Sequence, residues 1–129
     1  MANATAITVT DLTANAVTTR PTGDTLDTGT AAVTLAAAVG GIGSRVIIEV
    51  TNTAAANLVA SVAAGDEPPA YNAGIGALAS SNIAQNAVVY MGPFEMGRFG
   101  KSTGNLSVTF TPASGTIGAT IRCYRLPKI

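Results

Sequence analysis

Seven acidic side chains and one cysteine are the first candidates in this chain for acid–base, metal or nucleophilic chemistry, because it has no histidine. Histidine is the usual general base and the commonest metal ligand near neutral pH. The acids cluster only at Asp24 with Asp27 and at Asp66 with Glu67, and neither spacing fits a calcium-binding loop. Cys123 has no histidine to activate it, so we interpret it as a small core residue. The sequence therefore predicts no enzyme, no metal site and no cofactor.

Two further motifs have both a chemical and a structural interpretation. Residues 40–44 are glycine-rich like a phosphate-binding loop, but such a loop needs a helix after it. The pattern from Arg45 onward predicts a strand instead, so we interpret residues 40–44 as a turn. Residues 94–101 interleave aromatic and basic side chains, as a surface for single-stranded nucleic acid would. Because the net charge is zero, we interpret this second motif as hairpin packing.

The charge balance and the N-terminus limit the partners that we expect. Seven basic residues balance seven acidic ones, so the chain lacks the basic excess of a nucleic-acid-binding or membrane-surface protein. The apolar run at residues 31–43 is too short to span a bilayer, and the first residues do not resemble a secretory signal. We therefore expect no nucleic acid and no membrane as partner, and synthesis in the cytoplasm.

Alternation of apolar and polar residues with a period of two dominates the chain and predicts β-strands. Residues 106–111 alternate apolar side chains with hydroxyls, and residues 45–51 place aliphatic side chains on one face and Glu49 on the other. Glycine, proline and asparagine clusters between the strands predict turns. Further strands are expected at residues 5–11, 31–37, 58–62, 87–91 and 117–123, with a weak candidate at 97–100.

Two segments depart from this pattern. Residues 1–30 are rich in threonine, asparagine and aspartate, so we expect an extended N-terminal arm or edge strand that orders against a partner. Residues 64–86 form a long connection, and such connections are commonly functional or carry a short helix. One helical turn is a candidate at residues 74–84. The fold that we predict is all-β: a single domain with the arm and first edge strands in residues 1–30 and a jelly-roll-like antiparallel β-sandwich in residues 31–129.

One part of the chain resembles a group of small virion proteins of tailed bacteriophages. In that group a turn and a short strand precede a Gly-Pro-Phe corner, and two alternating strands follow it. Here the corner is Gly92-Pro93-Phe94, and the strands at residues 106–110 and 117–126 follow. The resemblance covers roughly residues 45–126. The corner also has a physical interpretation: glycine permits an unusual φ, proline fixes the next one, and the phenylalanine plugs the end of the sandwich.

The resemblance implies a capsid decoration (cement) protein that is not an enzyme. Such a protein binds the major capsid protein on the outer surface of the virion, commonly as a homotrimer, and stabilises the head. A neck, tail or fibre component is the alternative within virions, and a carbohydrate-binding β-sandwich that uses Tyr71 and Tyr90 is the alternative outside them. The candidate docking residues are Ala2, Asn3, Ala4, Thr5, Ala6 and Ile7 in the arm, and Asp66, Glu67, Pro68, Pro69 and Tyr71 in the long connection.

Overall fold

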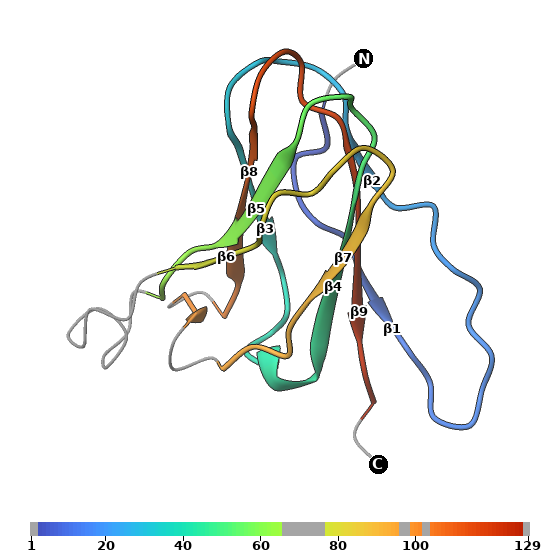
Figure 1. Ribbon diagram of the computed structural model, residues 1–129. Helices are drawn as coiled ribbons and strands as arrows, with labels where there is room; N and C mark the ends of the chain where they lie inside the picture. Colours follow the sequence, from blue (N-terminus) through green and yellow to red (C-terminus); the bar gives the residue numbers. More distant parts are fainter. Residues whose placement is uncertain (1–2, 66–76, 96–98, 102–103, 128–129) are drawn as a thin grey trace.

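The computed structural model of the chain describes residues 3–65, 77–95, 99–101 and 104–127. In these residues the backbone forms nine strands, which are arranged in two sheets (Figure 1). One short 3-10 helix, η1, precedes the fourth strand. The elements are β1 (Val9–Asp11), β2 (Asp24–Leu26), β3 (Val33–Ala37), η1 (Gly43–Arg45), β4 (Val46–Asn52), β5 (Leu58–Val62), β6 (Leu78–Ala79), β7 (Val88–Met91), β8 (Leu106–Pro112) and β9 (Ala119–Arg125).

The two sheets are mainly antiparallel, which confirms the predicted all-β class. The first sheet has the order β1-β9-β4-β7, with β2 also paired with β9, and the second has the order β3-β8-β5-β6. The longest pairing joins β4 and β9 from Val46 opposite Arg125 to Asn52 opposite Ala119. The strand β1 is an exception, because it runs parallel to β9. The arrangement is that of a β-sandwich.

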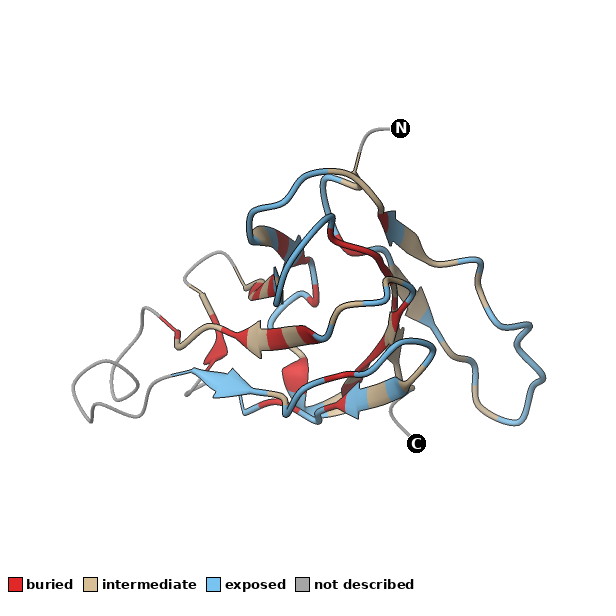
Figure 2. Ribbon diagram, turned by 45° about the horizontal axis from the view of Figure 1, so that its top comes forward, coloured by how far each residue is buried: buried red, intermediate tan, exposed pale blue. Residues whose placement is uncertain are grey.

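The core lies between the two sheets and takes alternate residues of the longer strands. Alternate residues of β8 and β9 are fully buried, and Figure 2 shows this banding of buried and partly exposed positions along the strands. Each fully buried aliphatic or phenyl side chain contributes roughly 1.5–3 kcal/mol to folding. The largest fully buried side chains include Leu26, Ile48, Leu58, Ile83, Phe94, Leu106, Phe110, Ile117 and Ile121.

The Gly92-Pro93-Phe94 corner follows the end of β7. Gly92 has a φ of +122°, and a Cβ at this position would lie 2.5 Å from the carbonyl oxygen of Val46. The N–H of Phe94 donates to the carbonyl of Gly43 at 2.8 Å, and its ring is only 1% exposed. The ring of Phe99 meets it edge-on, with 5.8 Å between the two centroids. The corner therefore brings two aromatic rings into the core beside η1.

The N-terminal segment lies against its own chain, and the extended arm predicted from the sequence is not confirmed. The side-chain oxygen of Asn3 accepts hydrogen bonds from the N–H groups of Asp27 and Thr28, at 2.8 and 3.0 Å. Four residues later, Ile7 is 3% exposed, and its N–H donates to the carbonyl of Ala36. Leu26 in β2 is fully buried as well. These polar first residues thus contain enough apolar anchors to join the sandwich.

Three smaller predictions are corrected in the described residues. Residues 77–84 contain no helical turn: β6 pairs with β5, and the buried Ile83 exchanges backbone hydrogen bonds with Leu58, which holds this segment extended. The weak strand at 97–100 is not seen where it is described, because the N–H of Phe99 donates to the carbonyl of Glu95 with helical spacing. The strand expected from Arg45 begins one residue later, since Arg45 ends η1.

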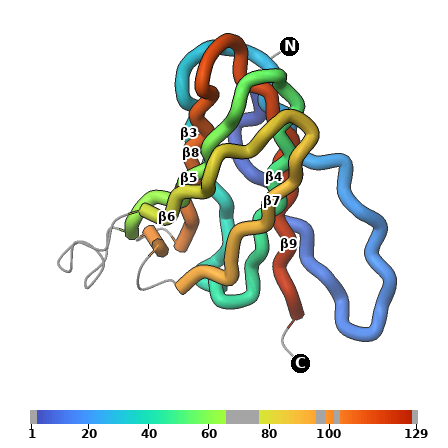
Figure 3. The backbone as a smooth tube through the Cα atoms, in the orientation of Figure 1, coloured from blue at the N-terminus to red at the C-terminus, as the bar shows by residue number. Residues whose placement is uncertain are grey.

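A loop at residues 12–23 projects from the sandwich, and we call it the projecting loop (Figures 1 and 3). It joins β1 to β2, and both strands pair with the same edge of β9: β1 with Cys123 to Arg125 and β2 with Ala119 to Ile121. Both ends of the loop are therefore fixed to one strand. Its residues 13–19 make no hydrogen bond to the rest of the described fold.

Candidate functional site

Glu49 is the centre of a polar cluster on the outer face of the first sheet. It lies on β4 between Tyr90 of β7 and Arg122 of β9, which are its partners in the two strand pairings. Arg122 Nη1 donates to Glu49 Oε2 at 3.1 Å, and Arg20 forms a second ion pair with the same oxygen. The hydroxyl of Tyr124 lies 3.5 Å from Oε1. Glu49 is only 4% exposed although it is on the side of the sheet away from the core.

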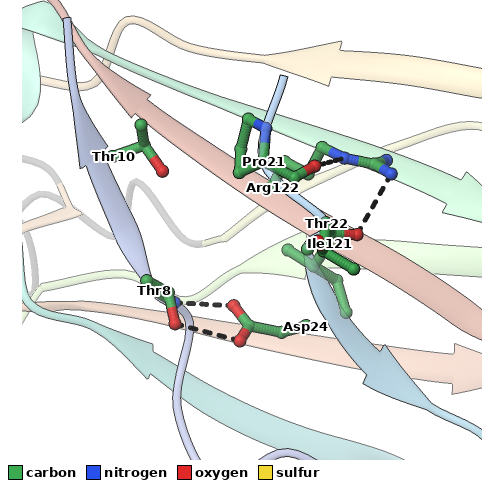
Figure 4. Close-up of a pocket in the computed structure, with 8 residues that line it drawn as sticks. Thr8, Thr10, Pro21, Thr22, Asp24, Ile121 and Arg122 are labelled. Atoms are coloured by element: carbon green, nitrogen blue, oxygen red, sulfur yellow. Dashed lines mark hydrogen bonds between the residues drawn. The ribbon is translucent and has the colours of Figure 1, made fainter. Parts of the chain in front are cut away.

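Arg20 of the projecting loop reaches Glu49, and Arg122 binds the loop where it returns to the sheet. Arg122 Nε donates to the carbonyl of Pro21 at 2.7 Å, and Nη2 donates to that of Thr22 at 3.2 Å (Figure 4). The outgoing end is held by Arg125, which makes two hydrogen bonds with the carboxylate of Asp11, at 2.5 and 3.0 Å. Each end of the loop is thus clamped by an arginine of β9.

The charges in this cluster stabilise one another. Burial acts to raise the pKa of Glu49, but hydrogen bonding and charge from Arg20, with Tyr90 and Arg122, outweigh it and lower the pKa from its ordinary value. The pKa of Asp11 is lowered by its hydrogen bond from Arg125. A general acid at neutral pH needs a raised pKa instead. The cluster therefore suits a permanent electrostatic clamp rather than proton transfer.

A notch of about 200 Å³ opens where β1 and β2 meet beside β9 (Figure 4). The carboxylate of Asp24 faces this notch and accepts hydrogen bonds from the N–H and the hydroxyl of Thr8, at 2.6 and 3.0 Å. Arg122 is occupied by the loop carbonyls described above. The oxygens of Asp24 and the guanidinium of Arg122 thus already have hydrogen-bond partners within the chain.

A second hollow, of about 390 Å³, lies between β6 and β7, and we call it the edge groove. The strand β6 is the last strand of the second sheet, and β7 is the last strand of the first. Leu78 is 39% exposed and Tyr90 66% exposed at the groove, and Val88 nearby is 42% exposed. The residues that line it carry no charge: Leu78, Ala79, Ser80, Ser81, Val89, Tyr90, Met91 and Gly92.

The residues predicted for docking fall into three groups. Asn3, Ala4 and Ile7 bond to residues 25–28 or to Ala36 in their own chain, whereas Thr5 and Ala6 between them are exposed. The remaining candidates lie outside the described residues, and these are Ala2, Asp66, Glu67, Pro68, Pro69 and Tyr71.

The acidic residues and Cys123 are the remaining groups that the sequence singled out for chemistry. Where the structure describes the chain, no three histidine, cysteine, aspartate or glutamate side chains come together to hold a metal ion. Cys123 is buried, and burial raises the pKa of its thiol to about 12, which agrees with its interpretation as a core residue. The helices of the described part include none that is long and apolar enough to cross a membrane.

Comparisons with protein-family models, with curated proteins and with solved structures found no match for this chain. The functional interpretation therefore depends on the geometry above and on the motif resemblance in the sequence. Sequence reasoning placed Glu49 on the outer face but missed the cluster around it. The strand that carries Glu49 and the two strands beside it are predictable one by one, whereas their register and the return of the projecting loop are not.

Proposed function

We propose that this chain is a decoration protein of a tailed-bacteriophage capsid, a non-enzymatic, jelly-roll-like sandwich on the outer surface of the virion. The observation that carries the proposal is the resemblance of residues 45–126 to small phage virion proteins. This stretch supplies β4 to β9, the strands that form most of both sheets. In this role a homo-oligomer, with a trimer favoured, binds the major capsid protein through many weak contacts in a symmetric array.

The exposed part of the N-terminal segment supports a docking role for residues 5 and 6. Thr5 and Ala6 face solvent, while Ala4 on one side and Ile7 on the other bond to the sandwich. The segment therefore presents a short surface whose two ends are already held, and docking costs less conformational entropy than ordering a free arm.

The test is co-sedimentation of the full chain with purified phage heads from which this protein has been removed. The wild type is expected to sediment with the heads, and Ala6→Asp is expected to bind about tenfold or more weakly, since it places a charge in the contact. Ala113→Asp, an exposed site in the turn after β8, is the matched control and should bind like the wild type. Failure of the wild type to bind would contradict the capsid as partner. Equal binding by Ala6→Asp and the wild type would contradict the docking role of residue 6.

The alternatives give different outcomes. Mass analysis of the intact virion should find copy numbers comparable to those of the major capsid protein, whereas a neck, tail or fibre component would be present in few copies. The exposed ring of Tyr90 beside the edge groove is the one described feature that favours a carbohydrate-binding sandwich. Glycan-array binding that is lost in Tyr90→Ala, together with no binding to heads, would support that function instead.

A further inference from the structure

The projecting loop presents an uncharged segment that turns at Asn15 and has no turn or bend at residues 17–19. Residues 13–19 contain only threonine, alanine, asparagine and valine, and Val17 is fully exposed. Asn15 has a φ of +57°, which turns the chain at the tip. The run of Val17 and the two threonines after it is β-branched and has high strand propensity. The segment therefore has the composition of a strand but lacks a sheet to join within the described fold.

The loop is anchored at both ends despite its exposure. Arg20 and Arg122 meet on Glu49 at the returning end, and Arg125 holds Asp11 at the outgoing end. Two strands that pair with β9 complete the support. A segment that is positioned in this way loses less freedom when it binds a partner.

The edge groove has the complementary features. The strand β7 is the last of its sheet, so one side of its backbone has no neighbouring strand among the described elements. Natural sheets protect such edges with charges, proline or bulges, but β7 consists of Val88, Val89, Tyr90 and Met91. Leu78 and Tyr90 expose apolar surface at the groove, whose lining is uncharged like residues 13–19. An extended, uncharged segment is the ligand that this edge suits.

The loop and the groove lie on opposite sides of the same molecule. The projecting loop begins and ends on the β1 and β2 side of the first sheet, and β7 is its opposite edge, as Figures 1 and 2 show. In this structure the loop of a molecule therefore projects away from its own groove. A contact between two different patches is heterologous and closes a ring when copies repeat it around an axis.

We propose that the projecting loop of one copy binds in the edge groove of a second copy, where residues 17–19 extend along β7 and Val17 contacts Leu78 and Tyr90. This inference refines the homo-oligomer of the proposed function by naming its interface. It does not depend on a capsid, because both surfaces belong to this chain.

The test uses two single variants and their mixture in sedimentation velocity. Val17→Asp puts a charge on the loop and leaves the groove intact, and Leu78→Asp puts a charge in the groove and leaves the loop intact. Each variant alone is expected to be monomeric at concentrations where the wild type is a ring, with association weakened by about 30-fold or more. The equimolar mixture is expected to form a heterodimer, because one intact loop and one intact groove remain. Ala113→Asp is the control and should associate like the wild type.

Each other outcome would overturn the interface. A wild type that stays monomeric up to millimolar concentration would exclude a ring, and wild-type association by Val17→Asp would exclude the loop. No heterodimer in the mixture would point to pairing of β7 with β7 of a second copy. If Leu78→Asp does not fold by circular dichroism, Tyr90→Ala takes its place. Binding to heads is measured separately, so a monomer that still binds heads contradicts only this interface.

Discussion

Glu49 of β4 and Arg122 of β9 are cross-strand neighbours on the outer face of the first sheet, with 3.1 Å between Glu49 Oε2 and Arg122 Nη1. Arg122 also binds two carbonyls of the projecting loop, and Arg20 of that loop binds Glu49. One buried carboxylate therefore connects two strands and the loop. This relationship makes Glu49 the polar residue of the outer face on which we expect stability to depend most.

Glu49→Gln keeps the shape of the side chain but removes its charge. The variant leaves Arg122 beside a neutral amide, and the free energy of unfolding at pH 7 is expected to fall by about 1.5–3 kcal/mol, the range for hydrogen bonds to charged groups. Urea unfolding followed by circular dichroism measures this change. Glu95→Gln, at an exposed position, is the control and should change stability by less than about 0.5 kcal/mol.

The ion pairs of Glu49 also make the stability of the fold depend on pH, in a direction that can be stated. The pKa of Glu49 is lower in the folded than in the unfolded state, whose ordinary value is 4.5. The stability from its charge is therefore complete above that value and is lost as the pH falls through the folded value. The unfolding free energies of the wild type and Glu49→Gln are expected to converge in acid. A constant difference down to about pH 2 would contradict the clamp.

Gly92→Ala tests the close approach at the corner. The new Cβ would lie 2.5 Å from the carbonyl oxygen of Val46, so the backbone must move. Gly29→Ala is the matched control, because Gly29 also has a positive φ, of +90°, but nothing lies within 4 Å of its Cβ position. We expect Gly29→Ala to cost about 1–2 kcal/mol from backbone conformation alone and Gly92→Ala to cost about 1–3 kcal/mol more. Equal losses of unfolding free energy for the two variants, measured with denaturant, would show that the backbone moves away from the new Cβ at no cost.

Asn52→Asp tests the buried polar residue at the end of β4. Asn52 is fully buried, and its Nδ2 donates to the carbonyls of Ala56 and Ile83, at 2.8 and 2.7 Å. An aspartate is nearly the same size but cannot donate when ionised. We expect a loss of about 2–4 kcal/mol, because two carbonyls lose their donor and face a buried charge. Thermal unfolding of Asn52→Asp against Asn57→Asp, at an exposed position, measures the effect.

Cys123 should not react with thiol reagents in the folded protein. It is buried on β9, and the pKa of its thiol is raised to about 12 by burial, so the reactive thiolate is scarce at ordinary pH. Labelling by a disulfide reagent at pH 8 is expected only in denaturant. A fast reaction without denaturant would mean that β9 opens readily, and the labelling rate would then report that opening.

Strands with one buried face were predictable from the sequence, because burial of one face requires apolar and polar residues to alternate. The predicted ranges overlap β1, β3, β4, β5, β7, β8 and β9. The strand β2 was missed, since Leu26 is its only apolar residue. The strand β6 was missed as well, because its two residues are both exposed and give no alternation.

The site was less predictable than the fold because it is made by residues that are distant in the sequence. Glu49 alternates like a solvent-facing residue, but Arg20 and Arg122 reach it from 29 and 73 positions away. No local pattern encodes those contacts. The parallel direction of β1 is likewise set by its place on β9 and not by its own three residues.

Both ends of residues 12–23 are attached to β9. The length of that segment can therefore change without disturbing the sandwich. A foreign peptide grafted in place of residues 14–18 would leave Asp11, Arg20 and their arginine and glutamate partners where they are. Evolution or an engineer could therefore vary what the molecule displays there while the scaffold beneath stays the same.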